Sequence, residues 1–122
     1  MTSFYVEVLG CQIERLQPAI GLTQLRAGNC LVDLVDVDGE LGRRGGAAPM
    51  VEGNNLDHVC FRIEPFIHDE IVAHLLNHSV TPGDVDPRYG AEGMGPSMYI
   101  SDPDGNTIEL KGPPDLSISP SR

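Results

Sequence analysis

One histidine and two carboxylates stand at positions from which they could bind a divalent metal ion. His58 lies near the start of one alternating apolar and polar stretch, and Glu109 lies in the last such stretch. Asp33 occupies a similar stretch near the start of the chain. Imidazole and carboxylate ligands on rigid strands, about 2.0–2.2 Å from a metal, leave open positions for a substrate. From spacing alone, a surface histidine and a strand-edge glutamate explain the same pattern.

The first third of the chain predicts the strands that would hold Asp33. They are expected at Cys11–Leu16, Leu22–Arg26 and Cys30–Asp36, after a helix that ends at Gly10. In the third strand Asp33 shares one face with two apolar neighbours, because side chains alternate along a strand. Residues 37–55 have no period and contain five glycines, which predicts a long connection.

A second set of elements follows this connection. It comprises a strand at Leu56–Ile63, an amphipathic helix at His68–His78, a brief strand around Val80 and a hairpin of Ser97–Ser101 with Thr107–Lys111. His58 and Glu109 each point away from the apolar side chains that would pack under the helix. The turn-rich stretch Pro82–Gly95 is expected to be a loop, with its glycine-rich end forming a mobile cleft edge.

The two halves repeat one another. Cys30–Leu34 aligns with Asn106–Leu110 at an offset of 76, which makes Asp33 the counterpart of Glu109. At the same offset the counterpart of His58 falls before Met1. We therefore expect the first half to lack its opening strand and most of its helix. We also expect the true gene product to begin upstream of Met1.

Four strings in the sequence resemble the vicinal oxygen chelate superfamily, which includes glyoxalase I, bleomycin and fosfomycin resistance proteins and extradiol dioxygenases. They are LDHVCFRI, GAEGMGPSMYISDPDGNTIELKG, SFYVEVLG and NCLVDLVDVDGELG. The resemblance covers residues 3–112. It implies an α+β fold of two βαβββ modules whose sheets curl around a metal-binding cleft, with the first module truncated at its N-terminus.

The resemblance also implies the roles of individual residues. By position, the ligands of a divalent metal (Zn, Ni, Mn or Fe) are His58, Glu109 and Asp33, and Glu109 is also the catalytic residue. Arg88, Tyr89 and Tyr99 are expected to contact the substrate. The first-module histidine has no counterpart in this chain, so the ligand set is one short.

The leading function implied by the resemblance is a metal-dependent lyase or isomerase acting on a small oxygen-rich substrate. Glu109 would move a proton through an enediolate. A dioxygenase would need two histidines and one carboxylate on Fe(II), so it fits this chain less well. The alternative is a non-catalytic module of the same fold that binds a small molecule or sequesters an antibiotic. The incomplete ligand set favours this alternative.

Composition limits the partners and the compartment. With 8 basic against 18 acidic residues the net charge is −10, which disfavours nucleic acid and anionic membranes as partners. The sequence shows no membrane-spanning run and no signal peptide, so a cytoplasmic protein, dimeric like many relatives, is expected. The cysteines, Cys11, Cys30 and Cys60, lack metal-site spacing and are expected to be free thiols.

The expected organisation is a single glyoxalase-like domain at 1–112 with a flexible tail at 113–122. Within it, residues 1–36 form the partial first module, 37–55 a linker loop and 56–112 the second module.

Overall fold

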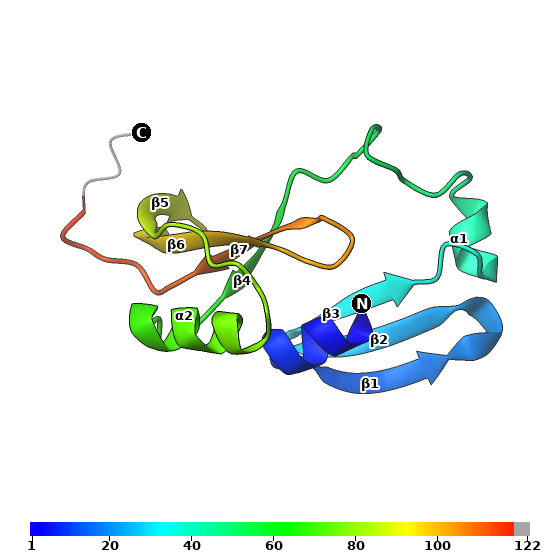
Figure 1. Cartoon of the computed structure of the whole chain (residues 1–122), viewed down its shortest axis with the longest axis horizontal. Coiled ribbons are helices and arrows are strands. Elements are labelled where there is room, and N and C mark those ends of the chain that lie inside the picture. The colour runs from blue at the N-terminus through cyan, green and yellow to red at the C-terminus, as the bar shows by residue number, and fades with distance from the viewer. Residues whose placement is uncertain (119–122) are drawn as a thin grey trace. The chain divides into compact units, whose positions relative to one another are not determined.

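The computed structural model describes residues 1–118, so the end of the predicted tail, 119–122, lies outside the described residues. The chain forms two compact units that divide between Asn55 and Leu56 (Figure 1). Each unit contains one β-sheet; the first also has three short helices and the second has one. The α+β class predicted from the sequence is therefore confirmed.

The first unit contains a three-stranded antiparallel sheet in the order β1-β2-β3. Its elements are the π-helix η1 (Phe4–Val8), β1 (Gln12–Gln17), the 3-10 helix η2 (Pro18–Ile20), β2 (Leu22–Ala27), β3 (Cys30–Val35) and α1 (Glu40–Arg44). Gly10, with a φ of +75°, follows η1 in the left-handed conformation that favours glycine. The three strands match the sequence prediction to within one residue at each end, whereas α1 was not predicted.

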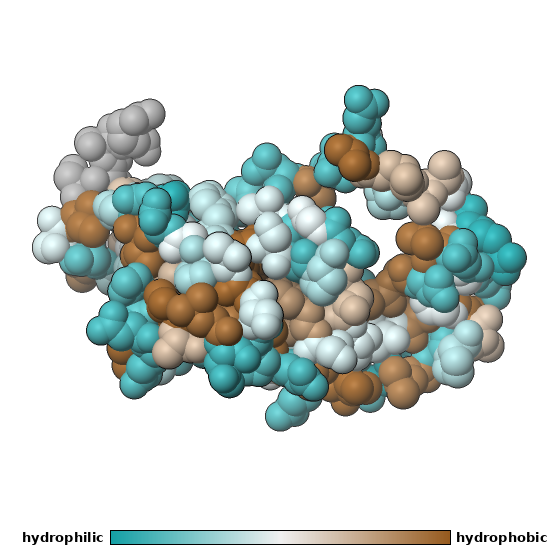
Figure 2. Space-filling model, viewed as in Figure 1, coloured by the Kyte–Doolittle hydropathy of each residue, from teal (hydrophilic) through white to brown (hydrophobic). Residues whose placement is uncertain are grey.

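The core of the first unit is small. Leu25 in the central strand is fully buried, and Phe4 and Tyr5 are buried with their rings edge to face at a centroid distance of 5.3 Å. The edge strand β1 nevertheless exposes Ile13 at 52% and Leu16 at 61%. Figure 2 shows apolar groups reaching the surface along the lower edge of the view, where β1 runs. Much of the apolar surface of this sheet is therefore not covered within its own unit.

The second unit contains a four-stranded mixed sheet in the order β4-β7-β6-β5. Its elements are β4 (Val59–Arg62), α2 (His68–Asn77), β5 (Asp86–Gly90), β6 (Gly93–Ser101) and β7 (Thr107–Lys111), which is a βαβββ succession. β4 pairs with β7 in parallel, and the other pairs are antiparallel. Asp102 holds the β6–β7 turn, because its carboxylate accepts the backbone N–H groups of Asp104 and Asn106.

Strand alternation gives this sheet one apolar and one polar face. The side chains on the apolar face, which is the face of the core, are Val59, Phe61, Met98, Ile100, Ile108 and Leu110. Figure 1 shows α2 alongside the sheet, and its Leu75 is only 1% exposed. We call the other side the polar face; it carries Cys60, Arg62, Ser97, Tyr99, Glu109 and Lys111.

Two sequence predictions for the second unit were wrong. No strand forms around Val80 in the described chain, and the stretch Pro82–Gly95 is not simply a loop. Its second half makes β5 and the start of β6, which meet in a hairpin where Gly90 pairs with Gly93. Gly93 has a φ of +116°, so glycine allows this tight return where composition had indicated a loop.

Two other expectations for the second unit are confirmed. The helix predicted at His68–His78 and the hairpin of β6 and β7 are present. All three cysteines are free. Within residues 1–118, no helix has the length and apolar character needed to cross a membrane.

Candidate functional site

The structure brings together His58 and Glu109, two of the three predicted metal ligands. His58 immediately precedes β4, and Glu109 lies in β7 opposite Cys60 of β4. The parallel pairing of β4 and β7 therefore places both residues on the polar face, with 3.2 Å between His58 Nε2 and Glu109 Oε1. The Glu109 side chain is 8% exposed and that of His58 is 33% exposed. A nearly buried carboxylate thus has an imidazole as its neighbour at the surface.

A second carboxylate holds the other ring nitrogen of His58. Asp57 Oδ2 lies 2.7 Å from His58 Nδ1. The hydrogen bond to Asp57 and the nearby charge of Glu109 raise the pKa of His58 above its ordinary value. Because carboxylates only accept hydrogen bonds when ionised, this arrangement favours an imidazolium that donates from both nitrogens.

Glu109 has another partner, Ser97, which was missed from the sequence. The fully buried Ser97 donates from Oγ to Glu109 Oε2 over 2.7 Å. Arg88 Nη1 in turn donates to the Ser97 carbonyl oxygen at 2.9 Å and to its Oγ at 3.1 Å. A hydroxyl that accepts from a guanidinium directs its own proton to the carboxylate. The sequence could have indicated Ser97 through strand alternation, because Ser97 is two residues before Tyr99 and therefore lies on the same face of the strand.

Arg88, Ser97, Glu109 and His58 form a polar cluster, and Tyr99 contacts both of its ends. The guanidinium carbon of Arg88 lies 4.5 Å from the centroid of the Tyr99 ring, a cation–π distance. The His58 ring stands nearly perpendicular to the same ring, with 5.5 Å between centroids. Two of the three predicted substrate contacts, Arg88 and Tyr99, therefore lie beside the His58–Glu109 pair.

Tyr89, the third predicted substrate contact, alternates with Arg88 along β5. It pairs with Met94 and is 66% exposed. Its neighbour Arg88 points to the cluster, so Tyr89 projects from the other side of the strand. A substrate contact by Tyr89 stays a prediction.

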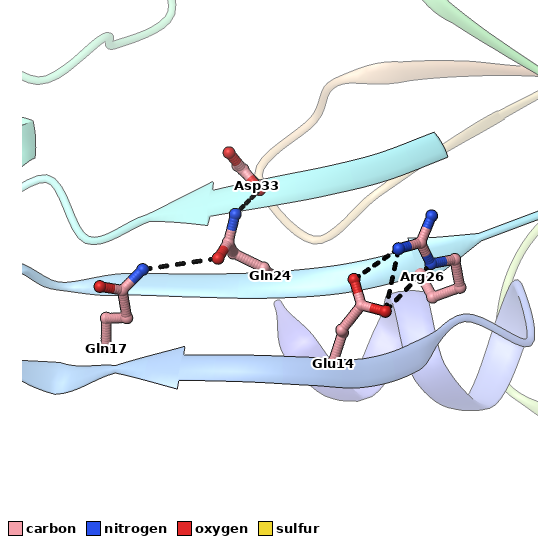
Figure 3. Close-up of polar contacts among 5 residues, drawn as sticks. All are labelled: Glu14, Gln17, Gln24, Arg26 and Asp33. Atoms are coloured by element: carbon pink, nitrogen blue, oxygen red, sulfur yellow. Dashed lines mark hydrogen bonds and ion pairs between the residues drawn. The ribbon is translucent and has the colours of Figure 1, made fainter. Parts of the chain in front are cut away.

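Asp33, the third predicted metal ligand, belongs to the first unit. Figure 3 shows it in a line of polar side chains across that sheet, where Gln24 Nε2 donates to Asp33 Oδ1 over 3.1 Å. Gln24 also accepts from Gln17 at 3.4 Å, and Arg26 binds Glu14 through both carboxylate oxygens. Asp33 is exposed within this line. Its role as a metal ligand stays a prediction.

Cys60 lies next to the cluster on the polar face. Burial raises the pKa of the Cys60 thiol, and the charge of Glu109 raises it further, while that of Lys111 lowers it. The thiol is therefore held in its protonated form, in which it is a poor nucleophile.

The donors in contact do not complete a metal site. Imidazole and carboxylate suit Zn, Ni, Mn or Fe, but such ions take three or more protein ligands. Among residues 1–118 no group of three or more His, Cys, Asp or Glu side chains is arranged to hold a metal ion. His58 and Glu109 supply two ligands, and each already has a polar partner in the protein.

Comparison with known proteins supports the fold. An integron cassette protein of V. cholerae aligns with a TM-score of 0.68 at 26% identity, over 91% of this chain and 82% of that one. TnmS3, an antibiotic binding protein from Streptomyces sp. CB03234, aligns with a TM-score of 0.61 at 25% identity, over 91% of this chain and 82% of that one. A lactoylglutathione lyase from Agrobacterium tumefaciens aligns with a TM-score of 0.60 at 21% identity, over 91% of this chain and 81% of that one. No protein-family model matches the sequence, and no curated protein matches it.

Proposed function

Since this chain has the vicinal oxygen chelate fold that its sequence predicted, we propose that it binds a small oxygen-rich molecule on the polar face of its four-stranded sheet. The observation that carries the proposal is the hydrogen-bonded chain from Arg88 through Ser97 and Glu109 to His58. Ser97 and Glu109 are buried, so their polar groups need partners, and these partners are in place before any ligand arrives. The hydrogen-bonded chain is therefore a preorganised surface.

The cluster offers complementary groups to oxygen atoms. His58 and Arg88 are partly exposed donors, with side-chain exposures of 33% and 30%. Glu109 is an acceptor for a hydroxyl, and the Tyr99 ring gives an apolar wall between the two donors. Two adjacent ligand oxygens, one accepting from His58 and one donating to Glu109, would replace the contact that these two side chains make with each other.

We favour binding without turnover, which is the alternative that the incomplete ligand set suggested. TnmS3, whose fold this chain shares at 25% identity, is an antibiotic binding protein. The described residues hold two metal donors in contact rather than three. The polar partners of His58 and Glu109 are supplied by Asp57 and Ser97, so the pair is complete as a hydrogen-bonding unit.

A metal-dependent lyase or isomerase is the second candidate, favoured by a different observation. The buried Glu109 carboxylate lies against an imidazole, and such a pair can take up and return a proton. A divalent metal, if bound, would polarise a carbonyl oxygen; its ligands would be His58, Glu109 and, by the sequence prediction, Asp33. A lactoylglutathione lyase has the same fold, although at 21% identity the likeness extends to the fold alone.

Isothermal titration calorimetry with catechol, pyruvate and bleomycin tests the proposal on the full chain. We expect saturable binding of at least one of these probes, weakened about tenfold or more by His58→Ala, a loss of at least ~1.4 kcal/mol. The matched control is His68→Ala, because His68 is exposed on α2 and lies outside the polar face. Absence of binding by all three probes, or equal affinity for both variants, would contradict the proposal.

Removal of metal separates the two candidates. Titration after treatment with EDTA, with elemental analysis of the purified chain, should show unchanged affinity and substoichiometric metal if the protein is a binder. Stoichiometric metal, with affinity lost on chelation, would instead favour the metal-dependent enzyme.

We also propose a homodimer in the cytoplasm. The three free thiols suit a reducing compartment, and two-module proteins with exposed apolar strands commonly associate. Sedimentation velocity of the full chain tests the dimer: a single species of twice the chain mass is expected, and a monomer at all concentrations would contradict it.

A further inference from the structure

Lys111 is the only lysine in the sequence, and it is buried. It ends β7 with 6% of its surface exposed. Its Nζ donates to the carbonyl oxygen of Gly93 over 3.0 Å. An ammonium has three protons to donate, and no other hydrogen bond from Lys111 Nζ is present within the described residues.

Lys111 differs from the two arginines around the polar face. Arg62 binds Glu64 and Glu92, both at 2.6 Å. Arg88 has Asp86 at 3.5 Å. Lys111 makes no ion pair with any carboxylate in residues 1–118. A buried charge without a counter-ion is destabilising. A role in binding a ligand would explain why a destabilising charge is kept at this position.

The position of Lys111 joins it to the candidate site. It is two residues after Glu109 on the same face of β7, and it is the register partner of both Ser97 and Arg62. The ammonium therefore belongs to the same electrostatic environment as the His58–Glu109 pair.

Two glycines allow the ammonium to approach the backbone closely. A Cβ on Gly90 would lie 3.2 Å from Lys111 Nζ, and a Cβ on Gly95 would lie 3.3 Å from it. The amine thus lies against the backbone of the β5–β6 hairpin. The four-carbon stem of lysine allows the ammonium to turn from this backbone toward a ligand on the polar face.

We propose that Lys111 forms a subsite for an anionic group, a carboxylate or a phosphate-like group, on the ligand of the polar face. The inference rests on the proposed function and deepens it by naming the charge of the ligand: its uncharged vicinal oxygens meet His58 and Glu109, and its anionic end meets Lys111. The chain carries a net charge of −10, which repels anions at long range. A local cation without a counter-ion in residues 1–118 is what would let this acidic protein select an anionic ligand.

A single lysine makes the test direct. In the full chain labelled with 13C-lysine, the ε-CH2 group gives one signal, which reports on Lys111 alone. We titrate acetate and, separately, inorganic phosphate, with sodium chloride at matched ionic strength as the screening control. Saturable movement with acetate but not phosphate identifies a carboxylate subsite, and the reverse a phosphate-like one; both support the proposal. Movement no greater than with sodium chloride overturns it.

Two variants separate charge from packing. Lys111→Arg keeps the charge, and we expect the binding of acetate or phosphate, followed at the backbone amides of Gly93 and Gly95, to stay within about threefold of the parent. Lys111→Met keeps an apolar stem, and we expect at least about tenfold weaker binding. Arg26→Met is the matched control, since it removes a positive charge from the first unit. Equal weakening in Arg26→Met and Lys111→Met would overturn the proposal, as would full retention in Lys111→Met.

Failure of this inference and failure of the proposed function give different results. If catechol binding depends on His58 but the Lys111 signal ignores both anions, the proposed function stands and the anionic subsite is wrong. If the anions bind at Lys111 equally well in His58→Ala and in the parent, and no oxygen-rich probe needs His58, the subsite stands and the proposed function is wrong.

Discussion

Each unit of this protein carries a carboxylate on the last strand of an antiparallel three-stranded run, and the two carboxylates have different surroundings. Glu109 on β7 is 8% exposed and has Ser97 and His58 as partners. Asp33 on β3 is exposed and has the hydrogen bond from Gln24. Four of the five residues of β7 are buried, whereas no residue of β3 is.

The difference follows from two elements of the second unit. β4 pairs with β7 on the side away from β6, so β7 is an interior strand, while β3 is at the edge of its sheet. α2 contributes the buried Leu75 to the core of the second unit. The pairing of β4 with β7 also brings His58 beside Glu109. Glu109, on an interior strand, is therefore buried with fixed partners, whereas Asp33, on an edge strand, is exposed.

The largest expected effect on stability comes from comparing a buried leucine of α2 with an exposed leucine of β1. Leu75→Ala should lower the free energy of unfolding by about 2–5 kcal/mol, because Leu75 is 1% exposed and its truncation leaves a cavity. Leu16→Ala in β1 is the control and should change it by less than about 0.5 kcal/mol, since Leu16 is 61% exposed. Urea unfolding measures both. Similar losses in the two variants would show that β1 is covered in solution.

A smaller effect contrasts the two carboxylates directly. Ser97→Ala removes the donor to the buried Glu109 carboxylate and should cost about 1–3 kcal/mol. Gln24→Ala removes the donor to the exposed Asp33 and should cost less than about 0.5 kcal/mol. Chemical denaturation of both variants gives the comparison. Equal costs would mean that burial is not what distinguishes Glu109 from Asp33.

The smallest effect is a pH dependence confined to the second unit, which contains all four histidines. The pKa of His58 is raised by Asp57 and Glu109, so its contribution to stability is fully present below the unfolded pKa of about 6.5. It is lost as pH rises through the higher folded pKa. Because His58 is one-third exposed, we expect less than about 1 kcal/mol. Denaturation at about pH 6 and pH 8 should show this fall in the parent and not in His58→Ala; an identical fall in that variant would assign it elsewhere.

Much of the fold could be predicted from the sequence because the signals are local. Alternation placed the strands of the first unit, and the 3.6-residue period placed α2. The Asp102–Asn106 turn follows from the chemistry of its own residues. β5 could not be predicted in this way, because proline and glycine at its ends resemble loop composition and its pairing with β6 is a tertiary property. The offset that matches Asp33 with Glu109 also could not show their different burial.

The site was predictable in part for the same reason. His58 and Glu109 stand out by residue type and by position on first and last strands. Ser97 and Lys111 could not be identified in this way, since neither residue type nor position in the sequence indicates that they are buried. Their importance comes from burial and from cross-strand register, with Lys111 opposite Ser97. Register can be known only when the strands are seen paired.

The most direct test of the central claim is a map of backbone amide shifts in 15N-labelled full chain on titration with the calorimetric probe that binds best, with EDTA present. Binding on the polar face predicts saturable shifts at His58, Cys60, Tyr99 and Glu109, with residues 12–35 of the first-unit sheet unchanged. Shifts confined to the first-unit sheet, or no saturable shifts at the polar face, would contradict the account.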